Sequence, residues 1–280
     1  MIDSHLHVWE RSRTPYAWLD GAPEKLQHDH DLDAAFADLA QHSVFGAVLV
    51  QADETLAETD YLLELAAADE RVLGAVCYLP LEQPEVVSRE LPRLREQPKF
   101  VGVRNLTHDR PDPDWILGEA QQRSIELLEE AGVPLDYVAV LPRHLENLAT
   151  IAARHPELTI VLDHLGHPPV GEDAESFGAW LNRFEMLAAA PNVVAKISGI
   201  YGPDGAAPPV EMDAIVDTAL GLFGHDRLML GSDWPVCRVY GGAEATMGTI
   251  MATLSRLPGE TQVALRRSTA TRVYGLQWSP

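Results

Sequence analysis

The sequence has little cysteine, few positive charges and no long apolar run, and each shortage excludes a class of protein. Its 280 residues include only two cysteines, so a disulfide-stabilised fold is not expected. Lysine and arginine total 21 against 42 acidic residues, a net charge of −21 that argues against nucleic acid or an anionic membrane as a partner. The apolar runs are too short to span a bilayer, and the N-terminus lacks the basic and apolar segments of a secretory signal. We therefore expect a cytoplasmic protein, and whether it forms a homo-oligomer stays open.

Short apolar runs alternate with amphipathic stretches along the whole chain. The runs predict eight strands, over Ile2–Trp9, Phe45–Gln51, Val72–Leu79, Phe100–Asn105, Val133–Val140, Thr159–His164, Val193–Ile200 and Arg227–Asp233. Helical spacing predicts the connecting helices, among them Trp115–Ala131, Met212–Phe223 and Glu260–Val273, with a weaker helix over Pro84–Glu96 that Pro92 interrupts.

This alternation predicts an α/β fold, a single (β/α)₈ barrel domain over residues 1–280. An open doubly wound sheet is the alternative. Such a sheet normally carries a glycine-rich phosphate loop after its first strand, and here the first strand is followed by Glu10–Pro15, which has no glycine.

Two H-x-H triplets are candidate metal sites. His5 and His7 lie two residues apart on the first predicted strand, so both imidazoles face the same side, and neutral imidazoles suit zinc and similar ions. The triplet is a weak signal alone, because His28 and His30 form a second one. That second pair lies in a polar segment ahead of a helix, and we interpret it as solvated surface. Only the first pair has candidate partners at other strand ends, where a barrel carries its active site.

Those partners are Asp233 and His164, each at the end of a later strand. Asp233 is interpreted either as a turn residue or as a metal ligand and general base for water. His164 is either a hydrogen-bonded core histidine or a ligand.

Five further side chains are candidates for contact with a small molecule. Arg104 ends the fourth predicted strand and needs an anionic or strongly polar partner, either a ligand or a structural carboxylate such as Asp136 or Asp163. Lys196 is likewise interpreted either as a contact to a ligand or as the ion-pair partner of a structural carboxylate. The set predicted to bind substrate is Arg104, Trp9, Gln51, Lys196 and Trp234.

Taken in order, these segments resemble the amidohydrolase-2 group of the amidohydrolase superfamily. Within that group the chain is similar to the sugar-acid lactonases that act on L-fucono- and L-rhamnono-lactones. The matching stretches are Asp3–Trp9, Val101–Asn105, Leu162–Pro169, Lys196–Gly199 and Gly231–Val236, which extend from one terminus almost to the other.

The resemblance implies a barrel with His5, His7, His164 and Asp233 around the reacting centre. It implies hydrolysis of a sugar-acid lactone, with Arg104 gripping the substrate. A divalent metal, zinc for preference, is expected on the three histidines and Asp233, although a metal-free route stays open. In either version a water attacks the lactone carbonyl and Asp233 takes its proton, while His164, Arg104 or the metal stabilises the oxyanion.

Three alternatives stay open from the sequence. They are a metal-dependent decarboxylase of an aromatic acid, a hydrolase of a non-sugar lactone or an amide, and a non-enzymatic binding protein on the same scaffold. His167 and Asn105 depart from the lysine and histidine that many relatives carry, which predicts an altered substrate preference.

Overall fold

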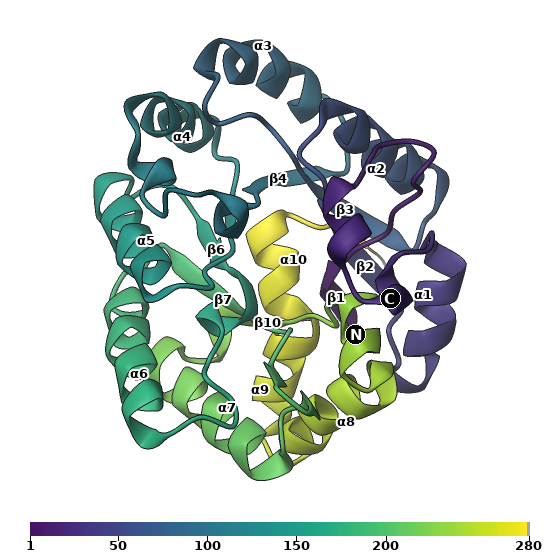
Figure 1. Ribbon diagram of the computed structural model, residues 1–280, viewed down its shortest axis with the longest axis vertical. Helices are drawn as coiled ribbons and strands as arrows, with labels where there is room; N and C mark the ends of the chain where they lie inside the picture. The colour runs from purple at the N-terminus through teal and green to yellow at the C-terminus, as the bar shows by residue number, and fades with distance from the viewer. Residues whose placement is uncertain (279–280) are drawn as a thin grey trace.

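Eight parallel strands form one sheet that curves round on itself in the computed structural model, which describes residues 1–278 (Figure 1). The strands, in their order around the sheet, are β1 (Ile2–Leu6), β2 (Gly46–Val50), β3 (Val72–Cys77), β4 (Phe100–Asn105), β5 (Leu135–Tyr137), β6 (Ile160–Leu162), β7 (Val193–Ile197) and β10 (Leu228–Leu230).

The barrel closes between β1 and β10. Leu6 and Trp234 form a parallel bridge there, and the Asp233 amide donates to the His5 carbonyl over 2.9 Å. The closure confirms the predicted (β/α)₈ barrel and excludes the open doubly wound sheet. It also brings residues from opposite ends of the chain into hydrogen-bonding contact.

Helices surround the barrel (Figure 1). They are α1 (Leu32–Leu39), α2 (Leu56–Ala68), α3 (Pro84–Arg95), α4 (Glu119–Ala131), α5 (Pro142–Arg154), α6 (Ala174–Ala188), α7 (Pro209–Phe223), α8 (Gly242–Ser255), α9 (Gly259–Val263) and α10 (Thr269–Tyr274). Asp31, Thr55 and Asp173 cap α1, α2 and α6, because each side chain accepts a hydrogen bond from a backbone amide of the first turn. No helix within residues 1–278 is long and apolar enough to cross a membrane.

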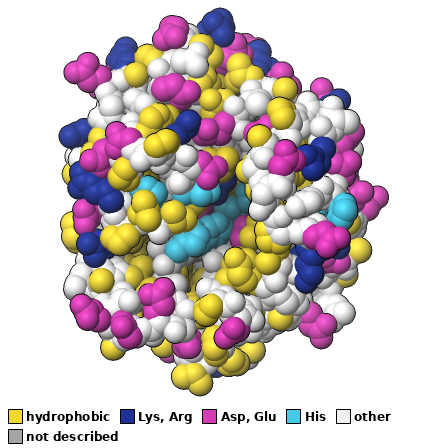
Figure 2. All heavy atoms as spheres, in the orientation of Figure 1, with side chains coloured by type: hydrophobic (Ala, Val, Ile, Leu, Met, Phe, Trp, Pro, Cys, Tyr) yellow, Lys and Arg dark blue, Asp and Glu magenta, His cyan; other side chains and the backbone are white. Residues whose placement is uncertain are grey.

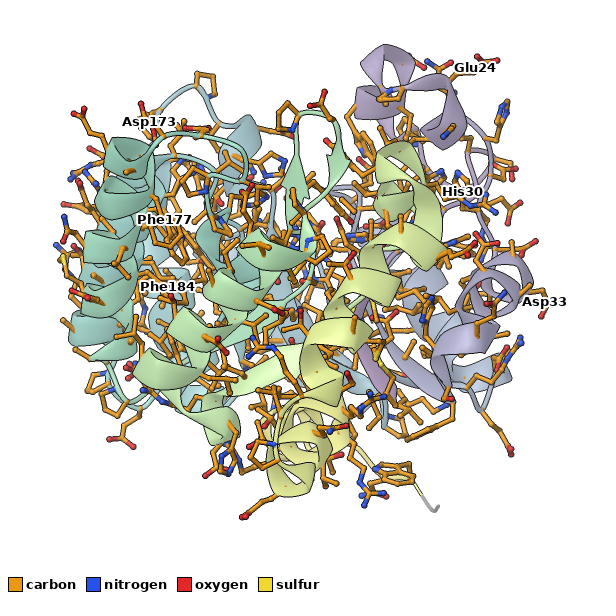
Figure 3. The ribbon with its side chains drawn as sticks, turned by 90° about the horizontal axis from the view of Figure 1, so that it is seen from below. Glu24, His30, Asp33, Asp173, Phe177 and Phe184 are labelled. Atoms are coloured by element: carbon orange, nitrogen blue, oxygen red, sulfur yellow. The ribbon has the colours of Figure 1, made fainter. Side chains whose placement is uncertain are left out.

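The two ends of the barrel differ in chemistry. At the amino end of the strands, apolar side chains that include Ile2, Val48 and Met229 pack against Ala270 and Tyr274 of α10, which covers this end. The connecting loops lie at the other end, where Figure 3 shows Glu24 and Asp173 on the same edge of the molecule. In that view α6 runs down one side of the barrel from Asp173 past Phe177 to Phe184.

The elements differ from prediction mainly in length. Every predicted strand exists, but most are shorter, because residues at one or both predicted ends lie outside the ladder. Pro92 does not stop α3, because Val87, Leu91 and Leu94 are buried at helical spacing. Burying each contributes about 1.5–3 kcal/mol, which offsets the roughly 3 kcal/mol cost of an interior proline.

Two predicted helices are divided, and one pair of short strands lies outside the predicted elements. The stretch Trp115–Ala131 divides at Gly118 into a 3₁₀ turn and α4, and Glu260–Val273 divides into α9, a π turn and α10. The segment after β7, for which no strand is predicted, contains a short hairpin of β8 (Tyr201–Gly202) and β9 (Gly205–Ala206).

Candidate active site

Three histidines and an aspartate converge where β1, β6 and β10 end. Asp233 Oδ1 lies 3.7 Å from Nε2 of His5, 3.6 Å from Nε2 of His7 and 3.9 Å from Nε2 of His164. All four residues are at most 5% exposed. Figure 2 shows histidine side chains gathered in a hollow at the centre of this face. We call these four residues the histidine centre, and the structure brings together every residue predicted for it.

The backbone around the histidine centre is held in an unfavourable conformation. His164 and Asp233 both have a φ of 55°, in the left-handed region that residues with a side chain seldom occupy. Such conformations cost about 1–3 kcal/mol each and concentrate at functional sites. Two glycines leave room for the rings: a Cβ on Gly199 would lie 2.4 Å from His164 Nδ1, and one on Gly231 would lie 2.6 Å from His5 Cβ.

Hydrogen bonds define how the histidines present their nitrogens. His7 Nδ1 lies 2.7 Å from the Val50 carbonyl and donates to it, so the lone pair of a neutral His7 is on Nε2. His5 Nε2 is 3.0 Å from that atom. Either His5 donates its Nε2 proton to His7, or both nitrogens offer lone pairs to one cation. The second arrangement requires a proton on His5 Nδ1, which lies 3.2 Å from Asp163 Oδ1 and 3.1 Å from Lys196 Nζ.

The ionisation states suit a cation. Burial lowers the pKa of His5 and of His164 well below the usual value, so both rings are neutral ligands at pH 7. Burial alone would raise the pKa of Asp233, but His164, His7 and a hydrogen bond from Tyr201 together lower it. The centre therefore offers imidazole nitrogens and an ionised carboxylate.

The surrounding charges also fit a divalent ion. Four buried carboxyl groups, those of Asp3, Asp136, Asp163 and Asp233, lie around the barrel centre with two buried cations, Arg104 and Lys196. A buried charge is costly unless it is compensated, and the shortfall equals the charge of one divalent cation. Donor atoms of His5, His164 and Asp233 lie within 4.8 Å of one another, so these residues fit a metal site, with His7 Nε2 beside them.

Beneath the histidine centre lies a paired network that we call the floor cluster: Arg104, Asp136, Asp163, Lys196 and Tyr274. Lys196 Nζ contacts Asp136 Oδ2 and lies 3.1 Å from Asp163 Oδ1. Arg104 Nε donates to Asp163 Oδ2 over 2.7 Å, and the Tyr274 hydroxyl donates to Asp136 Oδ2 over 2.7 Å. Although burial opposes ionisation of Asp163, Lys196, His5 and Arg104 hold its pKa well below the usual range.

A cavity of about 230 Å³ opens above the histidine centre. We call it the tryptophan lobe, and its lining includes Trp9, Trp18, Arg104, His108, Val138, His164, His167 and Asp233. Among the five side chains predicted to bind substrate, Trp9 and Arg104 line it.

The structure does not bring the other three predicted side chains to the cavity wall. Lys196 is fully buried in the floor cluster, which corrects its predicted contact with substrate and supports the ion-pair interpretation. Gln51 accepts from Arg104 Nη1 through its side chain at 3.3 Å and its carbonyl at 3.1 Å, so it positions the arginine. Trp234 is buried and donates through Nε1 to Asp38 over 2.9 Å.

The interpretation of the second H-x-H pair as solvated surface is wrong for His30. His28 is exposed, but His30 is 3% exposed and its ring packs between those of Trp9 and Trp234, at 5.0 and 5.3 Å between ring centres. The backbones of Trp9 and His30 also exchange two hydrogen bonds. A polar surrounding sequence gave no sign of this contact, because both partners lie far from His30 along the chain.

Sequence reasoning missed three residues of this region. Tyr201 donates from its hydroxyl to Asp233 Oδ2 over 3.0 Å, and Trp18 and His108 line the tryptophan lobe. All three lie on connecting segments, where no strand or helix period marks the direction of a side chain. The only available signal was their position in segments that follow predicted strands.

An eight-stranded parallel barrel with neutral imidazoles and a carboxylate at the carboxyl ends of its strands has the form of a barrel enzyme. The chain belongs to the amidohydrolase family, whose sequence pattern it matches over residues 2–276.

Two relatives are each called L-fucono-1,5-lactonase. The one from Burkholderia ambifaria is 32% identical, over 86% of this chain and 82% of the relative. The one from Burkholderia multivorans is 31% identical, over 98% of this chain and 96% of the relative. A crystal structure of an amidohydrolase from Burkholderia multivorans with bound zinc is similar with a TM-score of 0.87 and 29% identity, covering 99% of both chains.

Proposed function

We propose that this enzyme hydrolyses the cyclic ester of a sugar-acid lactone, of the L-fucono-, L-rhamnono- or L-galactono-lactone type. The two lactonase relatives support this reaction, because they align with 86% and 98% of the chain. The chemistry of the tryptophan lobe supports it independently.

The observation that carries the proposal is the charge balance of the tryptophan lobe. Its cation, Arg104, is already paired with Asp163. Burial lowers the pKa of His108 to about 4 and also lowers the pKa of His167, so neither ring is charged at pH 7. Asp233 and Asp109 add negative charge to the lining. A neutral substrate suits such a pocket, because a divalent cation at the histidine centre would only offset the negative charge already there, whereas an aromatic acid would add a further carboxylate.

The lining can also recognise hydroxyl groups. His167 Nδ1 lies 2.9 Å from the Ala139 carbonyl and donates to it, so Nε2 carries the lone pair that accepts a hydrogen bond from a sugar hydroxyl. The faces of Trp9 and Trp18 suit the C–H face of a sugar ring. Arg104 commits Nε and Nη1 to protein oxygens and makes no hydrogen bond through Nη2 to the described residues. That Nη2 group is free to donate to the substrate carbonyl.

In the proposed reaction a water beside Asp233 attacks the lactone carbonyl. Asp233 accepts the proton of the water through Oδ1, while Tyr201 holds Oδ2 and thereby fixes the orientation of the carboxylate. Arg104 and the rings around the centre stabilise the negative oxygen of the tetrahedral intermediate. The ring oxygen then leaves and takes up the proton. Zinc or another divalent cation on His5, His7, His164 and Asp233 would supply Lewis acidity and a more acidic water.

The test is a panel of neutral aldono-1,4- and 1,5-lactones, followed by proton release in weak buffer. Dihydroxybenzoate and a pyrone dicarboxylate serve as anionic substrates, and carbon dioxide is measured alongside. We expect turnover of an L-fucono-type lactone and at least a hundredfold lower kcat/KM for either anionic compound. Turnover confined to the anionic compounds, or release of carbon dioxide, would refute the proposal.

A further inference from the structure

A second cavity, of about 450 Å³, also borders Asp233. It shares His167, Asp233 and Val236 with the tryptophan lobe, and its remaining lining comes from Gly199, Tyr201, Gly202, Pro203 and Tyr240. We call it the hairpin lobe, because the β8–β9 hairpin supplies much of its wall. The candidate catalytic carboxylate therefore lies at the junction of two cavities.

The two lobes differ in their lining. The tryptophan lobe contains Arg104, His108 and Asp109, whereas Asp233 is the sole ionised side chain among the eight residues that line the hairpin lobe. Tyr201 and Tyr240 are stacked there, with ring centres 4.1 Å apart and planes within 8°. The Tyr201 hydroxyl is bonded to Asp233, so the orientation of this ring pair is fixed relative to the reacting centre. A flat, uncharged group suits this lobe.

A small lactone leaves the hairpin lobe unfilled. In a lactone, the ring ties the acyl carbon to the leaving oxygen, so both parts of the ester stay on one side of the carbonyl. An open-chain ester prefers the conformation in which its acyl chain and its alcohol group extend in opposite directions. Two cavities that meet at Asp233 offer separate space for the two parts of an open-chain ester.

We infer that the hairpin lobe is a leaving-group subsite, which gives this enzyme a further activity on open-chain arylmethyl esters of short 2-hydroxy acids. This inference rests on the proposed lactone hydrolysis, because it uses the same attacking water and the same Asp233. The hydroxy-acid part occupies the tryptophan lobe, and the aromatic ring occupies the hairpin lobe against Tyr240 and Pro203.

The reaction balances in the same way as lactone opening. The water oxygen forms a bond to the ester carbonyl carbon, and its proton passes to Asp233. The bond between that carbon and the alkoxy oxygen breaks, and the alkoxy oxygen takes the proton to become an arylmethyl alcohol. The carboxylic acid then ionises and releases one proton to solvent, so the products are a carboxylate, an alcohol and a proton.

The experiment compares benzyl lactate with ethyl lactate and with the best lactone of the panel. Benzyl and ethyl alcohols have similar acidity, so the two esters have similar intrinsic reactivity, and a difference in kcat/KM reports the fit of the ring. We expect benzyl lactate to be preferred by about tenfold, in line with burial and stacking of one aromatic ring.

Tyr240 variants separate this inference from the lactonase proposal. Tyr240→Ala should reduce the benzyl preference to about one- to threefold and leave lactone kcat/KM within twofold, while Tyr240→Phe should retain both. If lactones are opened but the unmodified enzyme shows no benzyl preference, the subsite is refuted and the lactonase proposal stands. If benzyl lactate is cleaved and no lactone is opened, the lactonase proposal is refuted and the subsite stands. Equal losses on ester and lactone in Tyr240→Ala would mean that Tyr240 acts through Tyr201 and Asp233, which also refutes the subsite.

Discussion

The histidine centre and the floor cluster are neighbouring sets of buried titratable residues that differ in how their charges are paired. The carboxylates of the floor cluster have cationic partners within the described part of the protein, and the carboxylate of the histidine centre does not. In the floor cluster, Lys196 lies between Asp136 and Asp163, and Arg104 donates to Asp163. In the histidine centre, two imidazole nitrogens lie 3.0 Å apart, and a carboxylate oxygen within 3.9 Å of three rings forms no ion pair with a lysine or arginine of the described residues. Both sets are as buried as the apolar core.

The difference shows that burial alone does not distinguish residues that support the fold from residues that take part in chemistry. A buried charge that is paired inside the protein contributes specificity and rigidity, and it has little left to offer a ligand. A buried group whose lone pair has no internal donor remains available for a water, a metal or a substrate. The predictions below test this division, beginning with the largest expected effect.

Asp233→Asn should abolish the proposed hydrolysis while the fold persists. The amide retains the shape of the side chain but cannot take a proton, so we expect kcat to fall by roughly 10³-fold, within the usual range for a positioned base. Lactone turnover and the far-ultraviolet circular dichroism of the variant give the two readouts. Asp226→Asn, at an aspartate that is 83% exposed and far from the cavity lining, is the matched control. A variant that keeps a tenth of the activity would show that Asp233 is not the base.

Lys196→Met should damage the floor cluster, with an effect on stability. Removing the lysine leaves Asp136 and Asp163 facing each other at zero exposure for both side chains, and breaking such a buried pair costs about 3–5 kcal/mol. Urea unfolding measures the loss. Lys25→Met removes an exposed lysine of the same length and should change stability by no more than about 0.5 kcal/mol. Similar unfolding midpoints for the two variants would contradict the conclusion that the floor cluster supports the fold while the histidine centre is available for chemistry.

The sequence predicted which side chains point into the barrel better than how far beneath its mouth each side chain lies. Strand ends and the period of two brought His5, His7, His164 and Asp233 together, because all parallel strands of a barrel end on one face. The same alternation directs Lys196 inward, but it does not say whether an inward side chain lies at the mouth or beneath it. Tyr201 and His30 were beyond prediction, because the first lies on an unforeseen hairpin and the second is buried by Trp9 and Trp234 from distant segments.

Zinc should stabilise the protein through the histidine centre. After treatment with a chelator, free zinc at a hundred times its dissociation constant should add about 2.7 kcal/mol to the free energy of unfolding, a rise in melting temperature of roughly 5 °C for a chain of this size. His5→Ala combined with His164→Ala should remove that rise, because both rings belong to the donor set. An equal rise in the double variant would place zinc elsewhere on the protein.

Glu58 extends the comparison to a buried carboxyl that has amide partners in place of a cation. Its two oxygens accept hydrogen bonds from the amides of Ala52 and Asp53, each over 2.9 Å. Burial raises its pKa from the ordinary value of 4.5 to about 8. Between these two pH values the unfolded chain has lost the proton and the folded protein still holds it. The stabilising contribution is therefore complete below pH 4.5 and is lost as the pH rises to about 8.

The smallest expected effect is the loss of this stabilising contribution as the pH rises. Between pH 6 and pH 7 the contribution of Glu58 should fall by about 1 kcal/mol, close to the limit for one proton per pH unit. Glu58→Gln cannot ionise, so the difference in unfolding free energy between the natural protein and this variant should shrink as the pH rises. Urea unfolding at half-unit steps from pH 5 to pH 8 measures the difference, and it cancels every other titrating group because both proteins share them. Parallel curves would show that Glu58 is already ionised in the fold, with the two amides compensating its charge as the cations of the floor cluster compensate Asp163.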